Sequence, residues 1–249
     1  MPDPTVFALG LLAAIWAGIS KGGFGSGAAF ASGLLLALVV DPAKALGIML
    51  PLLMLIDALT IRSFWGLWHR RSALALILGG VPGVGLGVLL FAVANDDVLR
   101  LLIAAVALGF VAWQLAGQFN MIRVRRAPFR WAPGLATGVF AGFTSFISHA
   151  GGPPVAVFLL AQGLAKTTYQ ATTVITFAVV NVIKSVPYAT MGFFTLETLT
   201  LGLWLAPAAA LGTWIGIKAH HRVPERLFFG LTYALLTVTG CKLVWDAVT

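Results

Sequence analysis

Residues 19–30 read ISKGGFGSGAAF and separate two apolar runs that would otherwise form plain membrane helix. A lysine and four glycines are unexpected there, because an ionisable group is costly inside a membrane and glycine weakens a helix. Glycine also lets the backbone turn tightly, and the helix after such a turn begins with unpaired N–H groups at the positive end of its dipole. The stretch therefore predicts a broken helix whose outgoing arm can bind an anion.

The composition of the chain is that of a membrane protein. Of its 249 residues, 59% are hydrophobic and only 10% are charged, and the mean hydropathy is +0.97. We therefore expect an all-α polytopic protein in a cell membrane such as the bacterial inner membrane, and we expect no removable signal peptide. Several segments approach the roughly 20 apolar residues that cross a hydrocarbon core: residues 43–61, 72–94, 98–117, 199–217 and 227–244.

The charges and the single cysteine exclude other classes of protein. The net charge is +8, but the basic residues gather in short loops beside apolar segments, where they orient a membrane protein, so no nucleic-acid partner is expected. Cys241 has no second cysteine for an internal disulfide or a Cys-based metal cluster. No metal site and no cofactor is predicted, and the partners expected are a small anion and the lipid bilayer.

The second half of the chain resembles the first when it is shifted back by about 125 positions. Ala17 and Gly18 then fall on Ala141 and Gly142, each pair followed by a glycine-rich break, SKGGFG or SHAGGPP. Such internal symmetry is typical of transporters. We predict a first transmembrane repeat over residues 1–117, a basic cytoplasmic linker over 118–130 and a second repeat over 131–249.

Loop charges predict that the two repeats have inverted topology. In the first repeat, residues 62–71 carry three arginines and residues 95–97 carry two acids. In the second repeat the signs are exchanged, because residues 187–198 carry one acid and residues 218–226 carry three basic residues. Since cytoplasmic loops are rich in Lys and Arg, the repeats would cross the membrane in opposite senses.

Each glycine-rich break is predicted to turn a helical hairpin inside the membrane, with three transmembrane helices after it. The segments beside the breaks, such as 6–20, 24–39 and 155–162, are shorter than a core of about 30 Å as helices. Two full spans in place of each hairpin remain the alternative. The two breaks would meet near the midplane, where transporters with inverted repeats hold substrate.

The breaks and one later helix supply the candidate binding residues. Lys21 and His149 stand just before the outgoing arms and would contribute charge or a hydrogen bond, and Asn181 and Lys184 share one helix face. The alternatives are that Lys21 and Lys184 extend to the surface, that His149 is satisfied at the external surface, and that Asn181 bridges two helices. The predicted substrate-binding residues are Ser20, Lys21, Gly22, Gly23, Phe24, Gly25, Ser148, His149, Gly151, Gly152, Pro153, Asn181 and Lys184.

Asp57 is a carboxylate inside the apolar run LMLIDALTI. It is either a proton carrier that couples transport to a gradient or a structural partner that neutralises Lys21 or Arg62. The structural pair is favoured, because a single carboxylate is little evidence for coupling.

Three stretches resemble the TauE/SafE family of membrane permeases, the sulfite exporter family. They are GISKGGFGSG at 18–27, FTSFISHAGGPPVAVFLL at 143–160 and NVIKSVPYATMG at 181–192. The resemblance covers nearly the whole chain and implies a duplicated polytopic secondary transporter for small sulfur-containing or organic anions, including sulfite and sulfonates. Members differ in substrate and direction, and a proton or sodium ion is a possible coupling ion.

Two other functions remain as alternatives, an anion channel and an intramembrane serine hydrolase. A hydrolase would use Ser26 as nucleophile and His149 as base, in the manner of rhomboid proteases. Those proteases require glycine two residues before the serine, and this chain has Phe24 there. We therefore expect a transporter and not an enzyme.

Overall fold

The computed structural model describes residues 3–24, 29–118, 126–220, 234, 237–238, 240–246 and 248, and the secondary structure of these residues is helical with no strand. The prediction of an all-α protein is confirmed. Within the described part of the chain, six helical segments are long and apolar enough to cross a membrane: Pro4–Phe24, Pro42–Phe64, Arg70–Phe91, Asp97–Gly117, Lys166–Thr190 and Leu196–Ala219.

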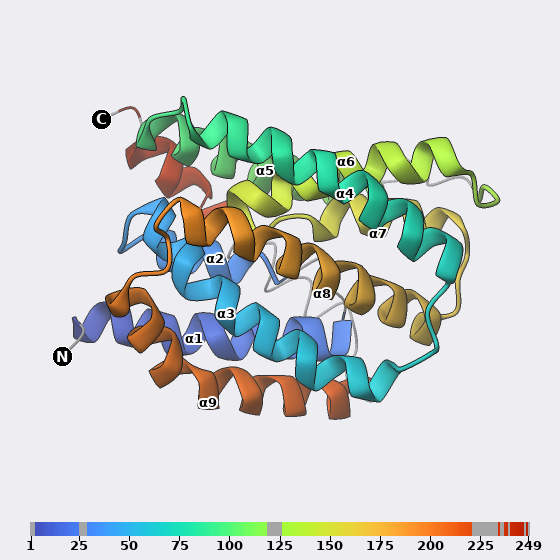
Figure 1. Ribbon diagram of the computed structural model, residues 1–249, viewed down its shortest axis with the longest axis horizontal. Helices are drawn as coiled ribbons and strands as arrows, with labels where there is room; N and C mark the ends of the chain where they lie inside the picture. The colour runs from blue at the N-terminus through green and yellow to red at the C-terminus, as the bar shows by residue number, and fades with distance from the viewer. Residues whose placement is uncertain are drawn as a thin grey trace.

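The elements follow one another along the chain in the order shown in Figure 1. Their bounds are α1 (Pro4–Ile19), the π-helix η1 (Ser20–Phe24), α2 (Ala31–Ala37), α3 (Pro42–Ile61), the 3-10 helix η2 (Arg62–Phe64), α4 (Arg70–Phe91), α5 (Asp96–Gln118), α6 (Trp131–Ser148), α7 (Gly152–Ala161), α8 (Lys166–Thr190) and α9 (Leu196–Ala219).

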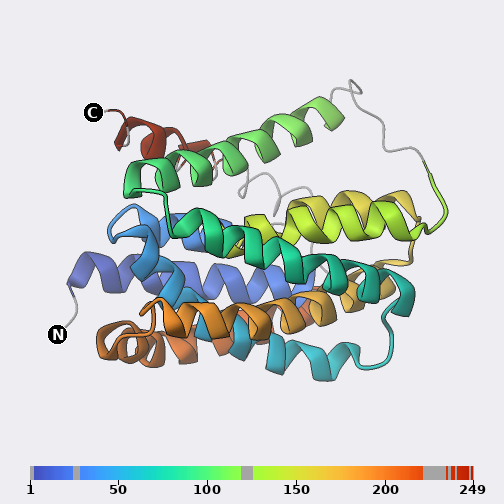
Figure 2. The ribbon, with the colours of Figure 1, turned by 45° about the horizontal axis from the view of Figure 1, so that its top comes forward.

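The helices lie roughly parallel to one axis and alternate in direction (Figures 1 and 2). From the N-terminal end at the left of Figure 1, α1 and α3 run to the right and α4 runs back. In the second half α6 and α8 run to the left and α9 runs to the right. The helices that follow the two breaks, α2 and α7, have only 7 and 10 residues and are too short to cross a membrane by themselves.

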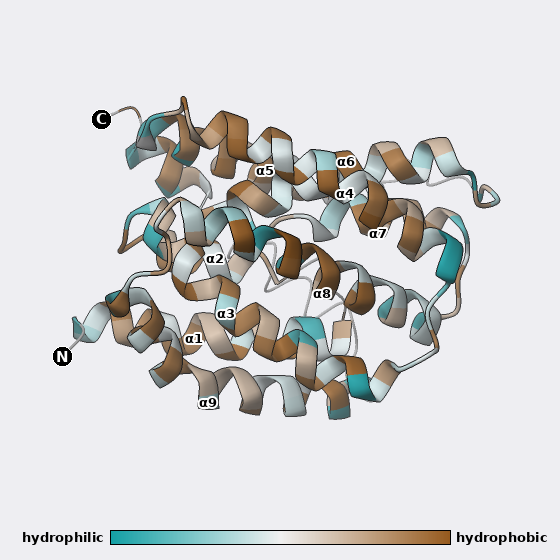
Figure 3. Ribbon diagram, in the orientation of Figure 1, coloured by the Kyte–Doolittle hydropathy of each residue, from teal (hydrophilic) through white to brown (hydrophobic). Residues whose placement is uncertain are grey.

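The two ends of the bundle differ in charge. Hydrophilic segments, teal in Figure 3, lie near both ends. One end, where α1 begins, is called the acidic end. Its described charged residues include the acids Asp3, Asp41, Asp97, Glu197 and Asp246 and the cations Lys44, Arg100 and Lys242. At the opposite end, the basic end, the described residues include no Asp or Glu and seven cations: Arg62, Arg70, Arg71, Arg126, Arg130, Lys166 and Lys218. The described parts of the three basic loops therefore lie at one end, in agreement with the loop-charge pattern.

Glycines let α4 pack closely on α6. A Cβ atom added to Gly83 would lie 2.1 Å from the backbone oxygen of Val139, and one on Gly87 would lie 2.7 Å from Phe146. Gly85, between them, faces open space. The small residues on one side of α4 thus serve helix packing, which is their usual role between membrane helices.

Candidate functional site

The first break begins with a π-helix that continues directly from α1. Residues 20–24 form the π-helix η1, a type of local distortion that is frequent at functional sites, and all five are buried. Gly25 and Ser26 lie outside the described residues. Gly22 and Gly23 pack against α9, because added Cβ atoms would lie 2.7 Å from Thr213 O and 2.4 Å from Gly216 O. These two glycines therefore face a neighbouring helix and serve close packing.

The second break is a single sharp turn at His149. Its backbone has φ 56°, in the left-handed region, and its N–H donates to Ser145 O at 3.0 Å. That conformation costs a non-glycine residue roughly 1–3 kcal/mol and is found mostly at functional sites. Gly151, Gly152 and Pro153 follow and are buried as α7 begins.

The breaks lie at different depths, which differs from the prediction that both turn at the midplane. Gly23 O in the first break accepts a 2.6 Å hydrogen bond from His220 Nδ1, just after α9 ends at the basic end. His149 in the second break lies beside Leu46, one turn into α3 from the acidic end. Each incoming helix thus passes the middle of the bundle before it breaks, since α1 with η1 has 21 residues and α6 has 18.

Lys21 and Asp57 form a buried ion pair, with 3% and 4% of their side chains exposed. The second carboxylate oxygen of Asp57 accepts a 2.6 Å hydrogen bond from Asn181 Nδ2 on α8. Arg62 is exposed. Asp57 is therefore an ion-pair partner of Lys21, Lys21 does not extend to the surface, and Asn181 bridges two helices.

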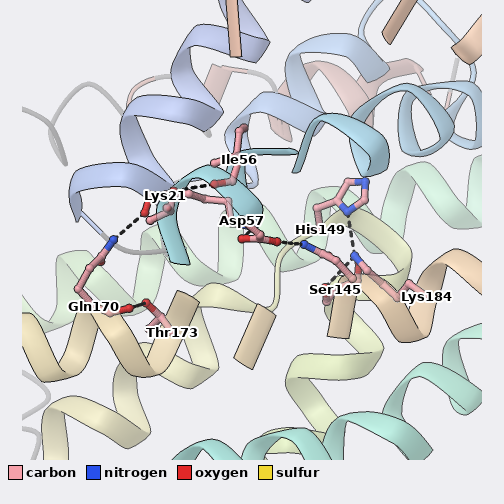
Figure 4. Close-up of polar contacts among 10 residues, drawn as sticks. Lys21, Ile56, Asp57, Ser145, His149, Gln170, Thr173 and Lys184 are labelled. Carbon is pink, nitrogen blue, oxygen red and sulfur yellow. Dashed lines mark hydrogen bonds and ion pairs between the residues drawn. The ribbon is translucent and has the colours of Figure 1, made fainter. Parts of the chain in front are cut away.

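Lys184 is fully buried and has only neutral contacts among the described residues. Its Nζ lies 3.0 Å from Ser145 O, Ser145 Oγ and His149 Nδ1, and 5.9 Å from the centre of the Tyr188 ring. The alternative that Lys184 extends to the surface is wrong as well. The cluster in Figure 4 thus contains two buried lysines and one buried carboxylate.

These polar groups surround a small cavity of about 10 Å³, which has room for about one water molecule. Three predicted residues, from both breaks and from α8, are in its wall, and Asp57 and Lys184 hydrogen bond directly to wall residues. The cavity is lined by Lys21, Ala29, Leu53, Ser145, His149, Phe177 and Asn181.

Three further polar residues, Ser148, Ser145 and Gln170, make contacts that the sequence did not predict. The Ser148 hydroxyl donates to Thr144 O at 3.1 Å within its own helix. Ser145 was not among the predicted site residues, although it lies one helical turn before His149, and that spacing is the signal that could have found it. Gln170 was also missed, and its Nε2 donates to Lys21 O at 2.6 Å.

Residues 9–243 match the family model described as sulfite exporter TauE/SafE. The chain belongs to the sulfite exporter TauE/SafE family. No curated protein and no solved structure shows significant similarity to it. The family is described as one of sulfite exporters, so this chain is an integral membrane protein of a transport family. Membership agrees with the prediction that the protein is not an enzyme.

Proposed function

We propose that this TauE/SafE protein is a secondary transporter that binds one small anion between its two helix breaks. The observation that carries the proposal is that the described residues include two buried lysines, Lys21 and Lys184, and one buried carboxylate, Asp57. Lys21 is already paired, whereas Lys184 is held by neutral acceptors. A buried charge without a counter-charge is unfavourable, so a site of this composition favours an anion as ligand.

The proposed substrate is sulfite, an organosulfonate or a related sulfur-containing or carboxylate anion. Such an anion offers several oxygens on a small head group. Lys184 Nζ, Ser145 Oγ and Asn181 Nδ2 are donors at or beside the cavity that could satisfy them. The family supports a sulfur oxyanion as the first choice.

A carrier is favoured over an open channel because the cavity is too small for such an anion. Aromatic side chains pack on the side toward the acidic end, where the rings of Phe146, Tyr188 and Phe193 contact each other edge to face or tilted. On the side toward the basic end, Phe177 forms part of the wall. Substrate entry would therefore require the broken helices to move, as in alternating access.

The packing supports inverted repeats with two broken hairpins, each followed by three helices. α1 packs on α9 through Gly18, whose added Cβ would lie 2.5 Å from Ala209 O, and α6 packs on α4 through Gly142, 2.4 Å from Gly80 O. A two-fold relation that exchanges α1 with α6 and α4 with α9 converts one contact into the other. The positive-inside rule supports a cytoplasmic location for the basic end. A bacterial inner membrane is the proposed location of the protein.

The test is anion binding to purified protein. Sulfite, sulfate, methanesulfonate and a neutral sulfone are compared on the wild type and on Lys184→Gln. We expect one of the anions to bind the wild type and to lose at least tenfold in affinity with Lys184→Gln, because a charge-assisted contact is removed. Lys218→Gln, which removes an exposed lysine at the basic end, is the matched control and should bind as the wild type does.

Equal binding by wild type and Lys184→Gln would contradict the proposed site. Reconstitution in liposomes then separates carrier from channel. A carrier should show saturable uptake of labelled anion, and unlabelled anion inside the vesicle should accelerate this uptake. A channel should not show this acceleration.

A further inference from the structure

His149 and Lys184 share one hydrogen bond between two groups that can each hold a proton. Nδ1 of His149 lies 3.0 Å from Nζ of Lys184, and both side chains are buried. The bond needs one donor and one acceptor, so either the ammonium donates to Nδ1 or the Nδ1–H donates to a neutral amine. With both groups protonated, two like charges would face each other at this distance without a hydrogen bond, which is strongly unfavourable. In this geometry the pair therefore holds at most one positive charge.

Among the described residues, no group of opposite charge contacts the pair. Asp57 is engaged by Lys21 and Asn181. The Tyr188 ring is centred 6.2 Å from the His149 ring, but its hydroxyl donates to a backbone oxygen on α6 at 2.6 Å. From α2 and α3, the neighbours of the ring are Gly33 and the backbone of Leu46, neither of which titrates.

The other edge of the His149 ring points away from Lys184, as Figure 4 shows. Nε2 is buried and has no hydrogen bond of normal geometry with any described group, although the backbone of Leu46 lies on this side. The adjacent ring carbon would lie 3.6 Å from a Cβ added to Gly33. One nitrogen of the ring thus faces the lysine, and the other lies on the far side of the ring, toward the backbone of Leu46.

Two further cavities continue from this edge toward the acidic end. The first, of about 10 Å³, has room for about one water molecule and is lined by residues that include Gly33, Ala37, Leu46 and Ser148. The second, of about 420 Å³, shares Ala37 and is lined by charged groups that include Asp41, Arg100 and Asp246. His149 lines the central cavity, and the residues beside its ring, Gly33 and Leu46, line the first of these two spaces.

We propose that the Lys184–His149 pair takes up one proton when the anion binds, and that His149 passes this proton between Lys184 and the acidic end. The inference rests on the proposed anion site. The negative charge of the anion would compensate a second positive charge on the pair, so that both groups are protonated only while the anion is bound. The proton comes from solvent by way of Nε2 and leaves with the anion, which makes the protein a proton–anion symporter.

Proton uptake on binding tests this directly. Purified wild-type protein in weak buffer with a pH-sensitive dye is titrated with methanesulfonate, whose sulfonate group stays ionised near neutral pH and cannot itself release or take up the proton. We expect about one proton per bound anion, and an affinity that falls up to tenfold for each unit of rising pH.

His149→Asn is the informative variant. Asparagine tolerates the left-handed backbone and can accept a hydrogen bond from Lys184, but it does not titrate. Its affinity for methanesulfonate should be lower than that of the wild type at low pH, and proton uptake and the pH dependence of binding should disappear. A melting temperature within a few degrees of the wild type checks that it is folded, and if it is not, the pH dependence of wild-type affinity still decides.

The outcomes separate the two proposals. Binding of methanesulfonate by the wild type without proton uptake, or with affinity independent of pH, overturns the coupling proposal and leaves the anion site standing. Uptake that persists in His149→Asn also overturns it, because another group then carries the proton. Absence of binding by methanesulfonate, sulfite and sulfate alike contradicts the anion site itself.

Discussion

Asn181 Nδ2 donates a 2.6 Å hydrogen bond to Oδ2 of Asp57, across 124 residues of sequence. The two residues occupy equivalent places in α3 and α8 when the second half of the chain is shifted onto the first. Equivalent residues of two repeats can touch only close to the axis that relates the repeats. This bond therefore supports a two-fold axis that passes near the small cavity, and it places the charged cluster where the two halves meet.

Removal of the carboxylate should destabilise the protein through the lysine left behind. Asp57→Asn leaves Lys21 buried without its counter-charge, and loss of one partner of a buried pair typically costs about 3–5 kcal/mol. The double variant Lys21→Met with Asp57→Asn should recover most of that loss, because no unpaired charge remains. Denaturation in detergent measures the free energy of unfolding of the wild type and of both variants. A double variant no more stable than Asp57→Asn would contradict the pairing.

Close packing of α4 on α6 predicts opposite results at neighbouring glycines. Gly83→Ala places a Cβ 2.1 Å from Val139 O, so the helices must separate, at a cost of about 1–3 kcal/mol. Gly85→Ala points into open space and should be neutral or slightly stabilising, since alanine is the better helix former. The melting temperatures of the two variants are compared with that of the wild type. An equal decrease in melting temperature at both positions would contradict the close contact between α4 and α6.

Phe177 is expected to keep the cavity closed on the side of the basic end. It lines the cavity, is 4% exposed, and its Cε1 would lie 2.6 Å from a Cβ added to Gly151. Phe177→Ala should cost about 3–5 kcal/mol of stability and enlarge the cavity. Liposomes with this variant should show faster uncoupled anion flux than the wild type, with Phe177→Leu between the two. Unchanged flux in a folded Phe177→Ala protein would argue against this role.

The start of α1 predicts a small pH effect outside the membrane. Asp3 accepts hydrogen bonds from the N–H groups of Thr5 and Val6, which hold the pKa of its carboxyl below the usual value. A lowered pKa in the folded state means that the stabilisation is present above the unfolded pKa and is lost as pH falls through the folded one. Asp3→Ala should therefore be less stable than wild type at pH 7, and the difference should shrink toward pH 3. A difference that grows in acid would be inconsistent with the cap.

Much of the fold could be predicted from the sequence because membrane helices are local structures. Residues 72–94 were expected as a membrane helix and correspond to α4 (Arg70–Phe91), and residues 199–217 correspond to α9 (Leu196–Ala219). Both breaks were located from their glycines. The depth of the breaks in the bundle could not be predicted. The length of the helix beside a break does not show how far that helix extends past the neighbouring helices.

The candidate site was predicted in part. Lys21, His149, Asn181 and Lys184 do gather around one cavity or its wall. Ser145 was missed because serine in a membrane helix commonly bonds its own preceding turn, as Ser148 does. Its contact with Lys184 depends on how α6 and α8 are rotated toward each other, and the sequence carries no strong signal for that.

The sequence by itself determined that the chain is helical and membrane-spanning, where its helices are interrupted, and which few polar residues stand among apolar ones. The reason is that a backbone in hydrocarbon must satisfy its hydrogen bonds within each helix, so length and composition decide the elements. Only the tertiary structure decided that Lys21 pairs with Asp57 while Lys184 meets Ser145 and His149. Those contacts join segments far apart in the chain, and their formation depends on close glycine-mediated packing between helices, which no local pattern specifies.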